Sequence, residues 1–200
     1  MPLDRKIADV IVDYGGGIMK PLIAIIGVSG SGKTSLVNKV SKKFGYSVLK
    51  SYTTRLPREN DDADLSSHTF CDMKEAAFFS EQKQIVCSTW FAGNYYFCTK
   101  SQLDNSDLYV LDLKGLKDLY RNYHDRPIIS ILLDVDSSIV AERMSKRGDS
   151  DEEIFRRLQH DAEAFKGAKD YVDFVCDNST QDKCNEICEF IDMLFRYYKG

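Results

Sequence analysis

The residues that decide the fold are Pro21-Leu-Ile-Ala-Ile-Ile26 and Gly27-Val-Ser-Gly-Ser-Gly-Lys33-Thr34, which follow one another directly. The first stretch is an uninterrupted apolar run that predicts a buried strand. After the glycines, apolar side chains recur at helical spacing at Leu36, Val37, Val40 and Phe44. The second stretch fits the pattern GxxxxGK(S/T) at every fixed position, between a strand and a helix as that pattern requires. The sequence therefore predicts a phosphate-binding loop.

Each part of this loop has a chemical role in binding a nucleotide such as ATP. Glycines let the backbone wrap around phosphates, so that N–H groups point inward at the positive end of the following helix. Lys33 is placed to reach the β- and γ-phosphates, and Thr34 to supply a hydroxyl to Mg²⁺. We expect ATP contacts from Gly27, Val28, Ser29, Gly30, Ser31, Gly32, Lys33 and Thr34.

Asp112 ends a second apolar run, Leu108-Tyr-Val-Leu111. The carboxyl ends of parallel strands share the rim of the sheet with the phosphate loop, so a carboxylate there can hold the water shell of Mg²⁺. The other interpretation of Asp112 is a helix cap.

The rest of the chain alternates between strand and helix patterns. Further strands are predicted at 46–49, 108–113, 127–135 and 171–176, and helices at 116–123, 137–147, 151–165 and 184–198. This alternation predicts an α/β fold in which a parallel sheet carries helices on both faces.

Composition and charge exclude several classes of protein. The 200 residues include 27 Lys and Arg against 31 Asp and Glu, a net charge of −4. This balance argues against nucleic-acid and anionic-membrane partners, which need a basic surface. No stretch approaches the ~18 apolar residues of a membrane span, and the start of the chain does not read as a secretory signal. The six cysteines form no CxxC pair, which is typical of reduced thiols in a cytoplasmic protein.

Residues 1–18 look like an extension that precedes the domain. Gly15-Gly-Gly17 interrupts any regular element, and the first predicted strand begins only after Met19. We therefore hypothesise that Met19 is the native initiator; the alternative is a genuine N-terminal extension. The intact mass of protein made from the natural gene decides between them.

Residues 50–97 break the alternating rhythm and form a predicted insertion. Nine of the 23 aromatic residues lie here, from Tyr52 to Phe97. Such residues suit a small core of their own or a pocket that stacks a base. Arg55 and Arg58 stand on either side of Pro57, and two guanidinium groups aimed by a rigid turn suit a second phosphoryl group.

The order and spacing of six motifs resemble the guanylate kinase family over about residues 20–198. They are GVSGSGKTSL, SYTTRLPR, FAGNYY, VLDLKG, ERMSKRGDSDEEIFRRL and DFVCDN. The resemblance implies a P-loop core (19–49, 98–141 and 166–200), an insertion that binds a nucleoside monophosphate (50–97) and a helical lid (142–165). It also implies a cytoplasmic, ATP- and Mg²⁺-dependent kinase of purine nucleotide metabolism, a monomer or homodimer, whose default acceptor is GMP or dGMP.

The resemblance also implies roles for arginines on both sides of the site. Arg55, Arg58 and Tyr96 would hold the acceptor phosphate. Arg143 and Arg147 would clamp the donor phosphates, and Arg157 would bridge donor and acceptor. The residues agree with a lid, since these three arginines flank Gly148, and Ser150 with Glu153 predicts a capping box that starts the next helix. A lid that brings guanidinium groups onto a phosphoryl in transfer suits this chemistry.

The departures from the family pattern fall where the base is read. Counting back from Gly93-Asn-Tyr-Tyr96, the guanine-reading glutamate of the family falls on Cys87, and a serine falls on Cys98. Lys114 replaces the second aspartate of the family's DxD, although Asp112 remains. His68 replaces a phosphate-binding tyrosine, and Ser51, a base contact, is kept. The predicted acceptor site therefore comprises Ser51, Arg55, Arg58, His68, Cys87, Tyr96, Cys98 and Asp112.

These departures leave more than one candidate for the molecule that accepts the phosphoryl group. A thiol is a weak hydrogen-bond acceptor, and losing a charged hydrogen bond costs roughly 1.5–3 kcal/mol. A different or modified nucleoside monophosphate therefore competes with GMP. Ribose 1,5-bisphosphate is a second candidate, since Lys114 suits an additional phosphate. A third hypothesis is a non-catalytic guanylate-kinase-like binding module, although such modules usually have a degraded phosphate loop.

Overall fold

The computed structural model describes residues 19–57, 68–91 and 93–198. Its central sheet has the strand order β6-β1-β7-β8, and every pairing in it is parallel. The strands are β1 (Leu22–Ile26), β6 (Leu108–Val110), β7 (Ile128–Asp134) and β8 (Phe174–Asp177). The predicted buried strand is thus one of the two inner strands of the sheet, with all five of its residues buried.

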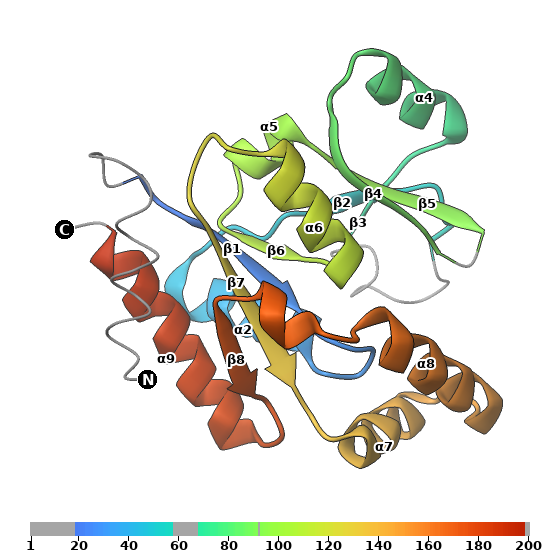
Figure 1. Cartoon of the computed structure of the whole chain (residues 1–200), viewed down its shortest axis with the longest axis vertical. Helices are drawn as coiled ribbons and strands as arrows, with labels where there is room; N and C mark the ends of the chain where they lie inside the picture. The colour runs from blue at the N-terminus through green and yellow to red at the C-terminus, as the bar shows by residue number, and fades with distance from the viewer. Residues whose placement is uncertain (1–18, 58–67, 92, 199–200) are drawn as a thin grey trace.

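Helices cover both faces of this sheet, as predicted (Figure 1). Successive side chains of a strand point to opposite faces. Ile23 and Ile25 pack with α2 (Lys33–Phe44) and α9 (Gln181–Tyr197) in one buried cluster. The remaining residues of β1 pack on the other side, with α6 (Leu113–Asn122).

A second sheet of strand order β3-β2-β5-β4 is formed by the residues around the insertion. Its strands are β2 (Ser51–Thr53), β3 (His68–Phe70), β4 (Ile85–Phe91) and β5 (Asn94–Thr99), with helix α4 (Met73–Glu81) after β3 and α5 (Lys100–Asp104) after β5. Strands β4 and β5 pair antiparallel over most of their length. In Figure 1 this sheet and α4 lie at the upper right, away from β8 and α9.

The aromatic residues of the insertion pack on one another, as a small core there would require. The rings of Tyr52 and Phe97 are stacked with centroids 5.0 Å apart, and Phe79 of α4 lies 4.9 Å from Tyr52. Aromatic pairs at such distances stabilise a structure beyond the area that they bury.

Two helices, α7 (Ser137–Arg147) and α8 (Asp151–Ala164), form a pair at the lower right of Figure 1. A separate buried cluster that includes Val140, Met144 and Ile154 joins them. Helix α7 ends at Gly148, whose φ of +94° is a left-handed conformation that favours glycine. None of the helices in the described part of the chain is long and apolar enough to cross a membrane.

Helices α6 and α9 each begin three residues before their predicted starts at 116 and 184, and three predicted strands also differ from the structure. Residues 46–49 were predicted as a strand, but only Val48 makes a bridge, to Leu108. The backbone hydrogen bonds between this segment and the β6 side join Ser47 and Leu49 to Asp107 and Leu108, so the pairing ends after one bridge. Strand β6 stops at Val110, since Asp112 caps helix α6. The strand predicted from residue 171 begins at Phe174, because a 3-10 helix, η1 (Ala168–Tyr171), occupies the start of that segment.

The predicted capping box at the start of α8 is only half formed. Ser150 Oγ accepts the N–H of Glu153 at 3.3 Å, as expected of an N-cap. The Glu153 carboxylate, however, accepts a hydrogen bond from Arg157 at 2.6 Å. A guanidinium is a stronger partner for a carboxylate than a backbone N–H, because both groups are charged.

Candidate functional site

The phosphate loop joins β1 to α2 through glycines in left-handed conformations. Gly30 has a φ of +75° and Gly32 a φ of +93°. A Cβ on Gly32 would lie 2.6 Å from Nδ2 of Asn178, which leaves no space for a side chain. The loop therefore brings its backbone to the N-terminus of α2, where N–H groups and the helix dipole favour an anion.

Lys33, the first residue of α2, folds back over the loop. Its Nζ donates to the carbonyl of Gly27 at 2.6 Å and to that of Val28 at 2.8 Å. Burial lowers the pKa of Lys33 to about 8, although the nearby carboxylates of Asp161 and Asp112 act in the opposite direction. The ammonium thus stands in a desolvated place among carbonyls and carboxylates, where an added phosphate would stabilise its charge.

Two polar side chains hold the loop against the segment after β8. Asn178 Nδ2 donates to the carbonyl of Ser31 at 2.7 Å. Arg143 donates to the carbonyls of Asn178 and Ser179 at 2.7 and 3.0 Å, and to those of Gly30 and Ser31 at 3.4 Å each. The guanidinium of Arg143 therefore supports the loop through backbone carbonyls, and its contact with donor phosphates stays a prediction.

A cavity of about 570 Å³ opens beside the loop and brings together most of the residues predicted for the donor. Its predicted members are Ser29, Gly30, Gly32, Lys33, Thr34, Arg143, Arg147 and Arg157. Gly27 lines the neighbouring cavity instead, and Ser31 is fully buried within the loop. We refer to this space as the donor cavity.

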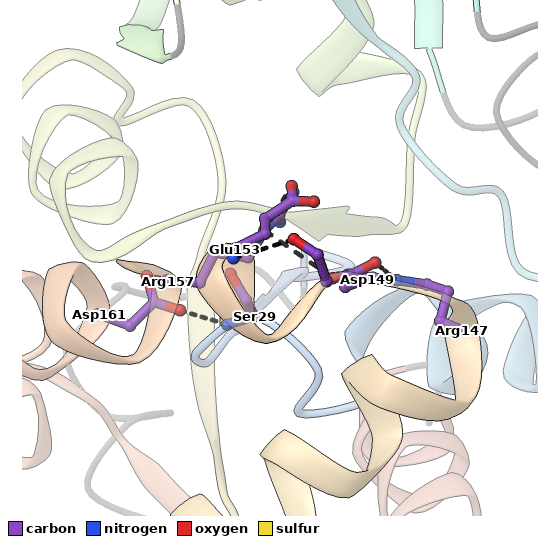
Figure 2. Close-up of polar contacts among 7 residues, drawn as sticks. Ser29, Arg147, Asp149, Glu153, Arg157 and Asp161 are labelled. Carbon is purple, nitrogen blue, oxygen red and sulfur yellow. Dashed lines mark hydrogen bonds and ion pairs between the residues drawn. The ribbon is translucent and has the colours of Figure 1, made fainter. Parts of the chain in front are cut away.

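The two other lid arginines predicted for the donor, Arg147 and Arg157, are held by carboxylates of the lid itself (Figure 2). Arg147 donates to Asp149 in a two-point contact, one bond of which measures 3.0 Å, and this pairing raises the pKa of Arg147. Arg157 pairs with Glu153 and has its Nε 3.9 Å from Asp149. These acidic partners fix the guanidinium groups near the donor cavity.

A second cavity of about 600 Å³ lies between the phosphate loop and the second sheet. The predicted acceptor residues that line it are Ser51, His68, Cys87, Tyr96 and Asp112. Ser29 and Lys33 line both cavities, so the two spaces meet at the phosphate loop. We refer to this second space as the acceptor cavity.

Three predicted acceptor residues are not among those that line this cavity. The guanidinium of Arg55 lies over the ring of Phe70, 5.7 Å from its centroid. Cys98 is fully buried behind the wall. Arg58 lies outside the described residues.

Cys87 and Cys98 face each other across strands β4 and β5. The hydrogen bond between the two thiols and their burial raise the pKa of Cys87, so this thiol is neutral. Tyr109 of β6 makes a side-chain hydrogen bond with Cys98. The wall of the acceptor cavity at Cys87 therefore carries no negative charge.

On the wall contributed by α6, Lys114 and Asp112 differ in what they can offer. Lys114 Nζ donates to the carbonyl of Ser88 at 2.6 Å and pairs with Asp118 at 2.8 Å. Asp112 caps α6 by accepting the N–H of Gly115 at 2.6 Å, and it lines the acceptor cavity with Lys33. Both interpretations of Asp112 are therefore compatible, because capping uses one carboxylate oxygen.

Ser51, His68 and Tyr96 form one polar group on the second sheet. Ser51 Oγ lies 3.2 Å from Nδ1 of His68, and the ring of Tyr96 meets the His68 ring edge-on at 5.7 Å. Strand pairing of β2 with both β3 and β5 places these side chains together.

The sequence analysis missed two residues that contact the phosphate loop. Asn178 is one, and Asp161 of α8 is the other, with its Oδ2 accepting the N–H of Ser29 at 2.6 Å (Figure 2). Asp161 could have been identified from its position seven residues, or two helical turns, after Ile154. This spacing places a charged side chain on the apolar face of the helix, where it needs a partner.

The donor groups present suit ATP and Mg²⁺. A loop closed to side chains at Gly32, a half-buried lysine and three arginines suit a polyphosphate. The hydroxyl of Thr34 and the carboxylate of Asp112 are oxygen ligands of the kind that Mg²⁺ takes, alone or through water. Within the described ranges, no three His, Cys, Asp or Glu side chains gather as a metal site.

Comparisons with known proteins agree with this geometry. A family model described as AAA domain matches residues 23–166. Among relatives, the guanylate kinase of Trichodesmium erythraeum is 27% identical, covering 80% of this chain and 90% of its own length. That of Chlorobium luteolum is 22% identical, covering 82% and 87%. The crystal structure of guanylate kinase from Anaplasma phagocytophilum superimposes with a TM-score of 0.66 at 19% identity, covering 86% of this chain and 85% of that chain.

The sheet, the loop and the flanking helices define an α/β protein of the P-loop class. Since the matched model covers more than half of the residues, the chain belongs to the AAA domain family. Its sequence and fold are also guanylate kinase-like, which confirms the resemblance inferred from the motifs.

Proposed function

We propose that the protein transfers the γ-phosphoryl group of ATP to a nucleoside monophosphate, giving ADP and a nucleoside diphosphate. The observation that carries this proposal is the meeting of the donor and acceptor cavities at Ser29 and Lys33. Two phosphorylated molecules bound in these cavities would direct their phosphates toward the same lysine. In-line transfer between them needs positioning and charge neutralisation rather than a strong base.

The residues of the chain would divide this work. The loop N–H groups and Lys33 hold the donor phosphates, and Arg147 and Arg157 approach from the lid to balance charge on the phosphoryl group. Thr34 and Asp112 would hold Mg²⁺, which neutralises charge on the phosphates of ATP. Tyr96 and His68 line the acceptor side, with Arg55 and Arg58 as the further groups that the family resemblance assigns to the acceptor phosphate. Closure of residues 142–165 over the site would exclude water.

The base of the acceptor is the finer part of the proposal. GMP or dGMP is the default of guanylate kinases, but guanine presents N–H donors that need an acceptor. Cys87 gives a neutral thiol there, and Lys114 gives a donor. A base that turns oxygen or ring-nitrogen acceptors toward this wall, in place of the N1–H and 2-amino donors of guanine, fits it better.

The deciding experiment measures ADP release from ATP and Mg²⁺ with a panel of acceptors. The panel contains the common ribo- and deoxyribonucleoside monophosphates and ribose 1,5-bisphosphate. Turnover with any nucleoside monophosphate supports the proposal, and the preferred base identifies the substrate. Lys33→Ala should abolish turnover without unfolding the protein; retained activity would place the donor site elsewhere.

A variant pair tests the assignment of Cys87 to the base. Cys87→Glu should raise the preference for GMP over other monophosphates, because a carboxylate accepts both guanine N–H groups. Cys87→Gln has nearly the same size without the charge, and it controls for the larger side chain. An equal preference in both variants would mean that Cys87 does not face the base.

The same acceptor panel also tests two alternative functions. Ribose 1,5-bisphosphate is favoured by Lys114, whose ammonium lines the acceptor cavity and suits an additional phosphate. ATP binding without turnover on any acceptor would favour a binding module.

We also propose that the protein has a cytoplasmic role in purine nucleotide metabolism, as a monomer or homodimer without nucleic-acid partners. We further propose that the chain is divided into a core, an insertion (50–97) and a lid (142–165).

A further inference from the structure

Asp161 is a carboxylate placed on the inward face of helix α8. Ile154 and Leu158 occupy the preceding positions of that face, and both pack into the cluster between α7 and α8. Asp161 is only 8% exposed. An acidic side chain is rarely buried in this way without a specific partner.

The partner is the phosphate loop. Asp161 Oδ2 accepts the backbone N–H of Ser29 at 2.6 Å (Figure 2), and its other oxygen lies 3.1 Å from Nδ1 of His160. The charge of Asp161 also acts to raise the pKa of Lys33, against the effect of burial. The carboxylate therefore uses a loop N–H and lies near the lysine, the two kinds of group that the loop offers to a phosphate.

A bound polyphosphate and this carboxylate cannot both keep these partners. Ser29 and Lys33 line the donor and the acceptor cavity, so phosphates in either would approach Asp161 closely. Like charges in a poorly solvated place repel strongly. One anion must therefore give way to the other.

We propose that Asp161 is an internal anion that holds the phosphate loop until a nucleotide phosphate displaces it. It is a positioning residue, and it acts through Ser29 and through the helix that carries it. The inference rests on the proposed function only in taking ATP as the displacing ligand.

Displacement of Asp161 would move the lid. Arg157 lies one helical turn before Asp161 on α8 and lines the donor cavity. When Asp161 leaves the loop, the helix is free to shift and carry Arg157 toward the phosphates. Arrival of ATP is in this way coupled to placement of a lid arginine.

We refer to the contact of Asp161 with the loop N–H of Ser29 as the latch. The latch should lower the affinity of the protein for ATP. Only the fraction of molecules with Asp161 displaced binds well, so the apparent dissociation constant rises by the inverse of that fraction. A hydrogen bond to a charged group changes an equilibrium by roughly ten- to a hundredfold. Removing the carboxylate should therefore tighten ATP binding about tenfold or more.

The test is equilibrium binding of Mg-ATP by calorimetry, without an acceptor, to the whole chain. Asp161→Asn keeps an oxygen that can accept the N–H of Ser29 but loses the charge. Asp161→Ala loses both the oxygen and the charge, and alanine favours a helix. Glu163→Gln removes the same charge from an exposed position of the same helix and serves as the control. We expect both Asp161 variants to bind more tightly than wild type, with the control within about twofold.

A purely structural role gives a different pattern. If Asp161 only braced the loop, Asp161→Ala would bind ATP more weakly and Asp161→Asn would restore wild-type affinity. That pattern, or unchanged affinity in both variants, overturns the latch and leaves the kinase proposal intact. If neither wild type nor any variant binds ATP, nucleotide binding fails and the latch fails with it. Having two variants keeps the test decisive if one of them does not fold.

Discussion

Gly32→Ala tests how closely the phosphate loop is fitted to the rest of the protein. The added Cβ would lie 2.6 Å from Nδ2 of Asn178, a side chain that is 4% exposed and donates to the carbonyl of Ser31. Gly32 also has a φ of +93°. The substitution therefore combines backbone strain with a collision.

Gly45→Ala supplies the matched control. Gly45 has a φ of +79°, but a Cβ there would meet nothing within 4 Å. Left-handed strain costs about 1–2 kcal/mol at either position. Only Gly32→Ala must also displace Asn178 and break its hydrogen bond, which adds about 1–3 kcal/mol. The total loss should be about 2–5 kcal/mol for Gly32→Ala and about 1–2 kcal/mol for Gly45→Ala.

Urea unfolding followed by circular dichroism measures both losses, and calorimetry measures ATP binding. Gly32→Ala should lose ATP binding under conditions where it is still folded, because the loop backbone has moved. Gly45→Ala, which lies at the far end of α2, should bind as wild type does. Equal losses of stability in the two variants would refute the packing of Asn178 against the loop.

Three further predictions concern titration and buried polar groups. Because burial lowers the pKa of Lys33 to about 8, the affinity for ATP should fall as pH rises through about 8. Lys33→Met should bind ATP weakly at every pH, without this fall. If calorimetry shows the same fall in Lys33→Met, the titrating group is not Lys33. Burial and the hydrogen bond to Asp192 raise the pKa of Tyr46 to about 12, so its stabilisation is complete below pH ~10 and lost as pH rises through about 12; Tyr46→Phe should lack this alkaline loss in unfolding titrations. Asp173 accepts from the N–H and Oγ of Ser130 at 2.8 and 2.9 Å; Asp173→Ala should lower the free energy of unfolding by about 2–4 kcal/mol, and a loss below about 1 kcal/mol in urea would show that water replaces the carboxylate.

The parts of the fold that local sequence determines were predictable. Strand β1 is an uninterrupted apolar run with all five residues buried, and helix α7 has the predicted bounds of residues 137–147. The 46–49 segment has the composition of a strand, but a ladder needs a partner that runs alongside it, and this segment bridges β6 only at Leu108. The late start of β8 follows from η1, which no apolar pattern marks.

In the site, too, the residues that are adjacent in sequence were predictable and their distant partners were not. A contiguous motif identified the phosphate loop, since its residues are adjacent in the chain. The partners of that loop are not adjacent: Ser29 and Asp161 are 132 residues apart, and Ser31 and Asn178 are 147 apart. No local spacing encodes such pairs. The position of Arg143 was predictable from the lid motif, but its bonds to backbone carbonyls were not, because they depend on where β8 ends.

The distance in sequence between the phosphate loop and Asn178 has a consequence for synthesis of the protein. The ribosome makes the loop early, but Asn178, which braces it at Ser31, is added only 147 positions later. Nascent chains shorter than this lack both Asn178 and α9, which covers one face of the sheet. ATP can stabilise only a state that binds it. Cellular nucleotide therefore cannot assist early folding, and the nearly complete chain must form its sheet before the ligand contributes.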